Sequence, residues 1–330
     1  MRIAVDAMGG DHAPGRIVDG ALAAARHLGI GVDLVGRTDM VRAELARHED
    51  ADGLDLRIIE APDVIEMAES PAQALRRKPR SSIRVAAELV ANGKAAALVT
   101  AGHTGAAVVA AHSAFGMLPG VDRPALAPSV PTRGGSAVLI DAGATVECKP
   151  RYLLQFGVMG AVYAKTWLGV QRPRVGLLSI GEEATKGNDL TRDAHQLLKA
   201  SRLQFVGNVE ARDIFSGQAD VIVCDGFTGN VALKLSEGLV EMVEELLGEE
   251  LQSTFSSQVG YLLSRRAFRR FRKRVDYSEY GGAPLMGVAG VCIVGHGRSS
   301  AKAVRNAVVM ASRFVSGNVL SRVEQEIASA

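Results

Sequence analysis

The chain has 330 residues, of which 47% are hydrophobic and 22% are charged, and it contains 36 glycines. This composition excludes an intrinsically disordered protein and provides enough apolar residues for a large core. The formal net charge at pH 7 is only +2, yet seven basic residues fall within positions 265–274. Because the rest of the chain is net negative, we expect one local basic patch and no general nucleic-acid-binding surface.

The cysteines and histidines give no metal-ligand spacing. The chain has three widely spaced cysteines, Cys148, Cys224 and Cys292, and this odd number favours a reducing cytoplasm over a disulfide framework. Cys224 lies at the end of an apolar strand and is expected to be buried. The seven histidines contain no H-x-x-x-H pair, so we predict no metal site. Asp6 follows only three apolar residues and residues 95–111 are interrupted by polar groups, so neither a signal peptide nor a membrane span is expected.

Short apolar runs followed by glycine-containing turns occur six times along the chain. The strands predicted from them cover residues 3–5, 95–99, 137–140, 175–180, 221–223 and 291–294. Continuous apolar runs are typical of strands that are covered on both faces, and strands alternating with helices indicate parallel crossovers. The sequence therefore predicts an α/β fold, a three-layer α/β/α sandwich with a mostly parallel sheet.

Helices are predicted between these strands, over residues 17–27, 82–92, 192–200 and 231–251. The last helix carries an apolar stripe at helical spacing, formed by Leu235, Leu239, Met242, Val243 and Leu246. The chain contains no Pro- or Ser-rich linker and no internal repeat. We therefore predict a single domain over residues 1–330, from which residues 245–280 project as a helical segment.

The glycine-rich turns lie at the carboxyl ends of the predicted strands, where open parallel sheets bind ligands. Glycine allows the backbone to approach a ligand closely, and the helix that follows directs unpaired N–H groups at it. These loops favour an anion, most simply phosphate, although any single glycine could serve only to turn the chain. Neither the P-loop pattern nor a clean dinucleotide fingerprint is present, so we expect no cofactor.

Polar side chains in these loops are candidates for the chemistry. Lys186 lies between Gly181 and Asn188, where an ammonium group would neutralise phosphate or an oxyanion, or simply be solvated. Asn230 is placed either to cap a helix beginning at Val231 or to direct its amide at a reacting carbonyl.

Two acidic residues flank the first glycine pair. Asp6 and Asp11 stand on either side of Gly9 and Gly10. They are expected to orient hydrogen-bond donors or to cap a helix that begins near Pro14.

Five segments in this order resemble the bacterial phosphate acyltransferase family, PlsX. They are Asp6–Pro14, Gly181–Asn188, Gly207–Glu210, Asp225–Asn230 and Asp276–Pro284, and the resemblance extends from about residue 3 to residue 313. The chain departs from the usual family pattern at His103 and Thr145, where the family has asparagine. These departures leave the motifs around Lys186 and Asn230 intact.

The resemblance implies an enzyme that converts an acyl thioester on acyl carrier protein, with inorganic phosphate, into acyl phosphate and free carrier protein. It places this reaction in phospholipid biosynthesis, upstream of a membrane glycerol-3-phosphate acyltransferase. It also implies a homodimer, with a fold similar to isopropylmalate and isocitrate dehydrogenases and to phosphotransacetylases. Phosphate is itself an oxygen nucleophile and a thiol leaves readily, so no acyl-enzyme is required.

The resemblance and the loop positions together give a set of expected site residues. Lys186 and Asn230 are assigned to stabilise the oxyanion, as catalytic residues. Contacts to phosphate or substrate are assigned to Asp6, Gly9, Gly10, Asp11, Gly102, His103, Thr104, Gly105, Gly181, Glu182, Asp225 and Gly229.

The basic patch falls in the predicted projection. On a helix over residues 261–275, four apolar residues share one face and arginines cover the rest, which is typical of a helix lying on an anionic membrane surface. The apolar face is formed by Tyr261, Phe268, Phe271 and Val275. Membrane or carrier-protein contact is assigned to Tyr261, Leu262, Leu263, Phe268, Arg269, Arg270 and Phe271. Peripheral association with the inner face of the cell membrane is expected; packing on a second subunit and docking of the acidic carrier protein are the alternatives.

Two other functions stay open. One is a related phosphate-handling enzyme, either a phosphotransacetylase acting on coenzyme A thioesters or a dehydrogenase of the isopropylmalate type. The missing dinucleotide fingerprint counts against the dehydrogenase. The other is a non-catalytic scaffold at the membrane surface. Thioester specificity separates the predicted enzyme from a phosphotransacetylase, and phosphate-dependent release of free carrier protein separates it from the scaffold.

Overall fold

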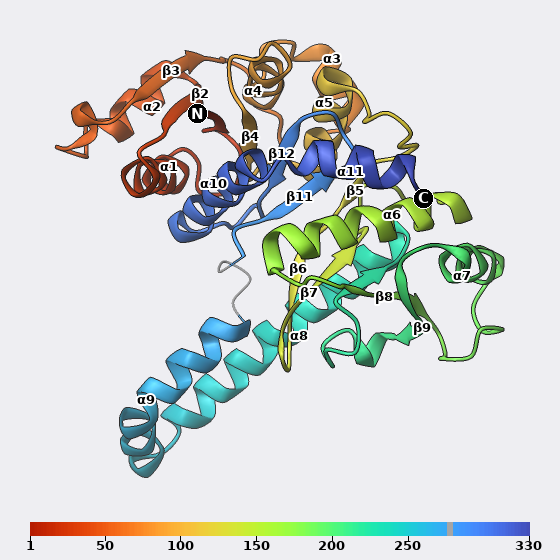
Figure 1. Cartoon of the computed structure of the whole chain (residues 1–330). Coiled ribbons are helices and arrows are strands. Elements are labelled where there is room, and N and C mark those ends of the chain that lie inside the picture. Colours follow the sequence, from red (N-terminus) through yellow and green to blue (C-terminus); the bar gives the residue numbers. More distant parts are fainter. Residues whose placement is uncertain (276–279) are drawn as a thin grey trace.

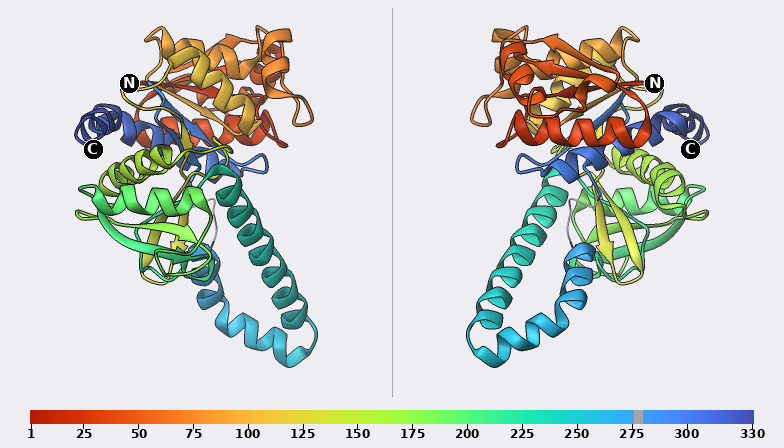
Figure 2. Two further views of the ribbon diagram at one scale, coloured as in Figure 1. Left: turned by 90° about the vertical axis from the view of Figure 1, so that its right-hand side faces the viewer. Right: turned by 90° about the vertical axis from the view of Figure 1, so that its left-hand side faces the viewer.

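The computed structural model describes residues 1–275 and 280–330. They form two mostly parallel sheets that are covered by helices, and a long helical hairpin that extends away from the sheets (Figures 1 and 2). The predicted three-layer α/β/α architecture is confirmed, with its strands divided between two sheets.

The first sheet has seven strands in the order β3-β2-β1-β4-β12-β11-β5. These are β1 (Arg2–Asp6), β2 (Gly31–Gly36), β3 (Leu56–Glu60), β4 (Ala97–Thr100), β5 (Ala125–Leu126), β11 (Ala283–Met286) and β12 (Val291–Val294). All neighbours are parallel except at β11, which is antiparallel to both β12 and β5. The central strands β4 and β12 are buried along their whole length, which explains their continuously apolar sequences.

The second sheet has five strands in the order β6-β7-β10-β8-β9. These are β6 (Ser129–Thr132), β7 (Gly135–Ile140), β8 (Arg174–Ser179), β9 (Gln204–Glu210) and β10 (Val221–Val223). Only β6 runs antiparallel to its neighbour. The predicted strand over 175–180 ends one residue early, because Ile180 turns out of the sheet and is 82% exposed.

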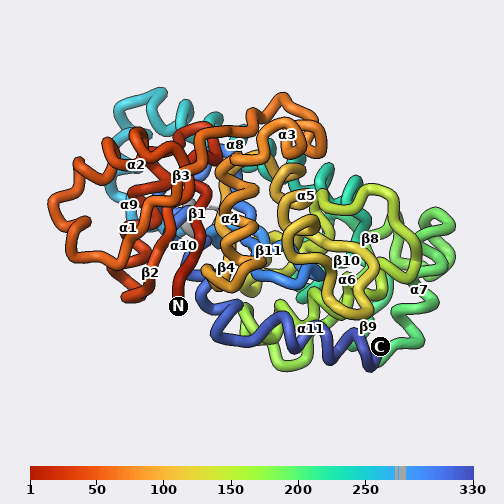
Figure 3. Tube along the Cα trace, turned by 90° about the horizontal axis from the view of Figure 1, so that it is seen from above, coloured from red at the N-terminus to blue at the C-terminus, as the bar shows by residue number. Residues whose placement is uncertain are grey.

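Nine helices of the described chain cover the sheets or pack on the helices that cover them. They are α1 (Gly15–Leu28), α2 (Thr38–Leu45), α3 (Pro71–Arg77), α4 (Ser82–Ala91), α5 (Thr104–Phe115), α6 (Pro150–Tyr163), α7 (Asp189–Ala200), α10 (Ala301–Ser316) and α11 (Val319–Ala328). The view from above places α2 and α7 at opposite ends of the molecule (Figure 3). One apolar cluster joins Val5 of β1 to Val138 of β7 and Phe156 of α6, which favours the single domain that we predict.

The helical hairpin consists of α8 (Gly226–Gln252) and α9 (Phe255–Val275). Helix α8 begins five residues earlier than predicted, after Asp225, whose carboxylate accepts a hydrogen bond from the Thr228 N–H at 2.9 Å. Asn230 therefore lies inside the helix, and the expectation that it caps a helix from Val231 is wrong. Residues 276–279 of the predicted projection lie outside the described residues.

The predicted apolar stripe of α8 faces solvent along most of this hairpin. Leu235, Leu239 and Leu246 are each more than half exposed. Neither this helix nor any other in the described part of the chain combines the length and the apolar composition that a membrane crossing requires. The stripe is therefore an uncovered surface of the single chain.

Substitutions at two glycines of α8 test whether the first turn of this helix is closely packed. A Cβ on Gly229 would overlap the carbonyl oxygen of Asp141, so Gly229→Ala should lower the free energy of unfolding by about 1–3 kcal/mol. Gly238 has open space around it, so Gly238→Ala should raise that free energy by about 0.5–1 kcal/mol. Chemical denaturation measures both changes. A Gly229→Ala protein as stable as Gly238→Ala would contradict the close packing.

Candidate active site

Loops at the carboxyl ends of β1, β4 and β12 pack on one another in the first sheet. The Asp11 N–H donates to the carbonyl oxygen of Gly297 at 2.8 Å. Gly10, with φ of +108°, leaves no room for a side chain, because a Cβ would lie 2.9 Å from the same oxygen and 3.1 Å from that of Ala101. Glycine is therefore required here by both conformation and space.

Asp6 lies beneath these loops, with only 2% of its surface exposed. Its carboxylate accepts hydrogen bonds from the Thr100 hydroxyl at 2.7 Å and from the Met8 N–H at 3.2 Å. The Thr100 oxygen in turn accepts from the Gly102 N–H at 3.1 Å. Burial raises the pKa of Asp6, and these donors oppose the rise. The structure thus places Asp6 where it orders the Gly9 and Gly102 turns.

Asp11 is exposed on the loop above Asp6. Helix α1 follows Pro14 without a side-chain cap from any described residue, so the expectation that Asp6 or Asp11 caps this helix is wrong.

His103 and Thr145, the two departures from the family pattern, both make local hydrogen bonds. His103 is the N-cap of α5, and its Nδ1 accepts from the Gly105 N–H at 3.1 Å. The buried Thr145 hydroxyl donates to the carbonyl oxygen of Pro124 at 2.8 Å. Thr104 and Gly105 form the first turn of α5 and are half-buried at the same edge.

Asp141 organises the corresponding loop of the second sheet. Its buried carboxylate accepts hydrogen bonds from four backbone N–H groups, those of Leu126, Gly143, Ala144 and Thr145. Burial raises the pKa of Asp141 to about 6, against the effect of these donors. The Gly226 N–H donates to the Thr145 carbonyl oxygen at 2.8 Å, which joins this loop to the start of α8.

Lys186 and Asn230 follow two adjacent parallel strands, β8 and β10, and so lie at the same edge of the second sheet. Asn230 is exposed beside the loop after β7, since a Cβ on Gly143 would lie 3.7 Å from the Asn230 Cβ. Lys186 is exposed on a turn that its own N–H closes on the carbonyl oxygen of Glu183, at 3.0 Å. Of the other expected contact residues in these loops, Glu182 is exposed and Gly181 is buried.

One contact between the two halves was not predicted from the sequence. Lys234, one turn beyond Asn230, places its Nζ 3.1 Å from His296 Nε2 and 2.7 Å from the Glu237 carboxylate. Nearby, Arg298 forms an ion pair with Glu241 at 2.6 Å. The glycines around His296 marked this loop, but nothing in the sequence indicated that its ring contacts α8.

Cysteine and metal chemistry find no support at this edge. The three cysteines are free, and Cys224 is buried as expected. Burial raises the pKa of Cys148 to about 12, which keeps that side chain a thiol near neutral pH. Over residues 1–275 and 280–330, no group of three or more His, Cys, Asp or Glu residues is arranged to hold a metal ion.

Comparison with known proteins identifies the family. A family model described as "Fatty acid synthesis protein" matches residues 1–322. The "Phosphate acyltransferase" of Geobacter sp. (strain M21) is 52% identical over 327 residues, which cover 99% of this chain and 93% of that protein. That of Acidobacterium capsulatum is also 52% identical, over 99% of this chain and 97% of its own length. The chain belongs to the phosphate acyltransferase (PlsX) family.

This membership confirms the predicted resemblance and makes the chain an acyltransferase of lipid biosynthesis. A phosphotransacetylase from Streptococcus pyogenes shares the fold, with a TM-score of 0.65 and 18% identity, over 96% of this chain and 94% of the other.

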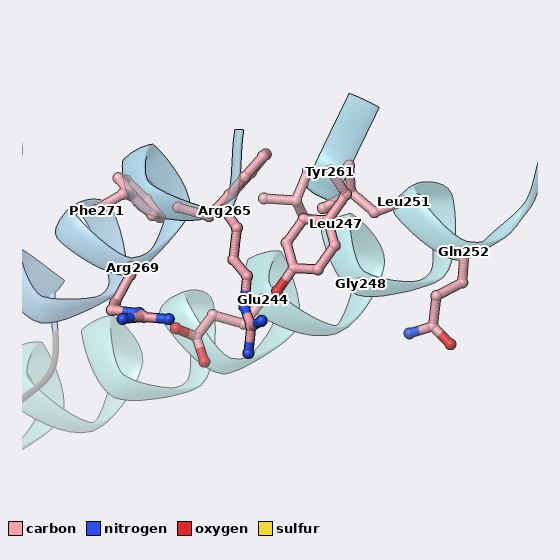
Figure 4. A pocket seen from close by; sticks show the side chains of 10 residues that line it. Glu244, Leu247, Gly248, Leu251, Gln252, Tyr261, Arg265, Arg269 and Phe271 are labelled. Atoms are coloured by element: carbon pink, nitrogen blue, oxygen red, sulfur yellow. The ribbon is translucent and has the colours of Figure 1, made fainter. Parts of the chain in front are cut away.

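In this phosphate acyltransferase family member, α8 and α9 enclose an apolar groove of about 330 Å³ (Figure 4). Tyr261, Phe268 and Phe271 line it, and the rings of the first two lie 5.3 Å apart. Leu262 and Leu263, in contrast, are 67% and 81% exposed. Of the expected membrane-contact residues, the two leucines therefore present the most apolar surface to solvent.

The arginines assigned to membrane or carrier-protein contact lie on the same helix. Arg269 and Arg270 are both exposed on α9, and Arg269 also lines the groove. The side chain of Val275, on the predicted apolar face, lies outside what the structure describes.

The His296 contact should weaken in acid. Burial and the neighbouring Lys234 lower the pKa of His296 from its ordinary value of 6.5. The neutral His296 side chain therefore contributes to the free energy of unfolding above pH 6.5, and this contribution is lost as the pH falls below that value. The charged groups that face it are Lys234, Glu237, Arg298 and Asp11. The free energy of unfolding of His296→Gln should therefore decrease less than that of the unsubstituted protein from about pH 7 to about pH 5.

Chemical denaturation across that pH range measures the difference between the two proteins. Equal slopes for His296→Gln and the unsubstituted protein would contradict the proposed cause.

Proposed function

We propose that this chain transfers the acyl group of an acyl carrier protein thioester to inorganic phosphate, releasing acyl phosphate and free carrier protein. The observation that carries the proposal is the common edge at which the Lys186 turn and the first turn of α8 leave adjacent parallel strands. Glycine turns and helix N-termini at the ends of such strands suit a small anion. The names of the relatives support phosphate as the acceptor.

The reaction needs few protein groups. A phosphate oxygen attacks the thioester carbonyl, the carbonyl oxygen becomes an oxyanion, and the carbon–sulfur bond breaks to release the thiol of the carrier protein. The Lys186 ammonium and the Asn230 amide stabilise the oxyanion, and the turns at Gly9–Asp11 and Gly102–Gly105 bind phosphate or substrate backbone. No cofactor takes part in this sequence of steps.

Apolar side chains beside these loops support an acyl chain longer than acetyl as the donor group. Val146, Ile180, Phe227 and Val231 are large hydrophobic residues that are at least half exposed. They lie in the loops after β7 and β8 and in the first turns of α8, on either side of Asn230. Binding an alkyl chain would remove this surface from water, at about 0.8 kcal/mol for each buried methylene group.

The helical hairpin supports two further parts of the proposal. The exposed stripe of α8, which includes Leu235 and Leu239, provides apolar surface for a homodimer. Leu262 and Leu263, with the arginines of α9, provide a peripheral contact for the anionic inner face of the cell membrane. A long-chain acyl phosphate would then be released near a membrane glycerol-3-phosphate acyltransferase.

An assay of thiol release tests the reaction. With acyl carrier protein thioester, release should require phosphate and should exceed release from the matching coenzyme A thioester. Lys186→Ala and Asn230→Ala should each lower kcat by about 10²-fold, because each removes an oxyanion donor. Normal turnover of both folded variants would remove their assignment, and a preference for coenzyme A would favour a phosphotransacetylase. Phosphate-independent release, or none, would remove the acyl-transfer proposal and leave the membrane scaffold.

Sedimentation with lipid vesicles tests the membrane contact. The protein should sediment with vesicles that contain anionic lipid and less so as salt rises, since each basic residue near such a surface contributes about 1 kcal/mol. Replacing Arg269 and Arg270 by glutamine should reduce binding. The same change at Arg76 and Arg77, exposed at the end of α3, removes equal charge and should have little effect. Equal binding to zwitterionic vesicles would contradict the proposal.

A further inference from the structure

Asn208 of β9 contacts the turn that carries Lys186. Its side chain is 8% exposed, and its Nδ2 donates to the carbonyl oxygen of Glu183 at 2.8 Å. The Lys186 N–H donates to the same oxygen at 3.0 Å. A single carbonyl group therefore closes the Lys186 turn and joins it to the neighbouring strand.

His195 of α7 fixes the orientation of the Asn208 amide. Its Nδ1 lies 3.0 Å from the Asn208 Oδ1, and because an amide oxygen only accepts, this ring nitrogen carries the proton. The ring is 6% exposed and meets Phe205 edge-on, with centroids 5.0 Å apart. With Oδ1 occupied by His195, Nδ2 is directed at Glu183.

A β-bulge makes this arrangement possible. Val175 of β8 pairs with Phe205, but the next residue, Gly176, pairs with Gly207, so Val206 is an extra residue in β9. One extra residue inverts the alternation of side chains, and Phe205 and Asn208 therefore both reach His195.

Gly207, next to the bulge, has φ of +96°, a conformation that favours glycine. The bulge and this glycine give the Gly207–Glu210 segment a physical role that the sequence did not indicate.

We propose that Asn208, oriented by His195, is a positioning residue that holds the Lys186 turn in the conformation needed for acyl transfer. The inference rests on the proposed function of Lys186. Asn208 acts through Lys186 and has no contact with the reacting atoms in this proposal. Lys186 is exposed on a loop that has no helix or strand of its own, so the hydrogen bonds to Glu183 reduce the number of positions its ammonium group can take.

A double-mutant cycle separates positioning from a general structural effect. Asn208→Asp keeps an acceptor for His195 but replaces the donor to Glu183 with an oxygen. It should lower kcat by about tenfold or more, with little change in KM for phosphate. In the Lys186→Ala background the same substitution should have little further effect. Gln204→Ala, at an exposed position of the same strand, is the matched control and should leave kcat unchanged.

An equal decrease of kcat in both backgrounds would overturn the inference. Hydrogen exchange gives a second readout that does not depend on activity. The amides of residues 183–187 should exchange faster in Asn208→Asp and in Asn208→Ala than in the unsubstituted protein, and unchanged exchange in either folded variant would overturn the inference. If the unsubstituted protein releases no thiol with phosphate, the proposed function fails, and hydrogen exchange still decides whether Asn208 orders the turn.

Discussion

The packing of the first turn of α8 against the Asp141 loop is the contact on which the rest of the site depends. The Gly226 N–H donates to the Thr145 carbonyl oxygen, and Gly229 leaves no space between the helix and the Asp141 carbonyl. Only glycine permits two backbones to approach so closely. This approach places Asn230 at the strand edge, and it sets the direction in which the helix leaves the sheets.

Helix α8 links the candidate site to the far end of the hairpin. Its 27 residues extend about 40 Å, from the strand edge near Asn230 to the turn before α9. Along this length it contacts the His296 loop through Lys234, and farther out it exposes an apolar stripe. Helix α8 therefore connects the strand edge near Asn230 to α9, which carries the exposed Leu262 and Leu263.

Each half of the molecule orders its loops with a buried carboxylate. Asp6 accepts from Thr100 and Met8 below the first set of glycine turns, and Asp141 accepts from four backbone N–H groups below the second. In both cases burial raises the pKa of the carboxyl group, and hydrogen bonds compensate for part of its lost hydration. Asn230 of α8 then lies beside the loop that Asp141 orders, close to Gly143.

The sequence by itself determined the α/β class and the central strands, because continuous apolar runs and glycine turns are local signals. The family followed from the resemblance of five short motifs, which are also local in the chain. It missed β9, where Asn208 interrupts the apolar pattern. It also began α8 too late, because Asp225 and Asn230 are both of residue types that cap helices and the prediction placed the cap at Asn230. The contacts of Asn208 and His296 were decided only by the tertiary structure. Both join segments that are distant along the chain, and no local spacing encodes a bulge or a loop contact that depends on how sheets and helices pack.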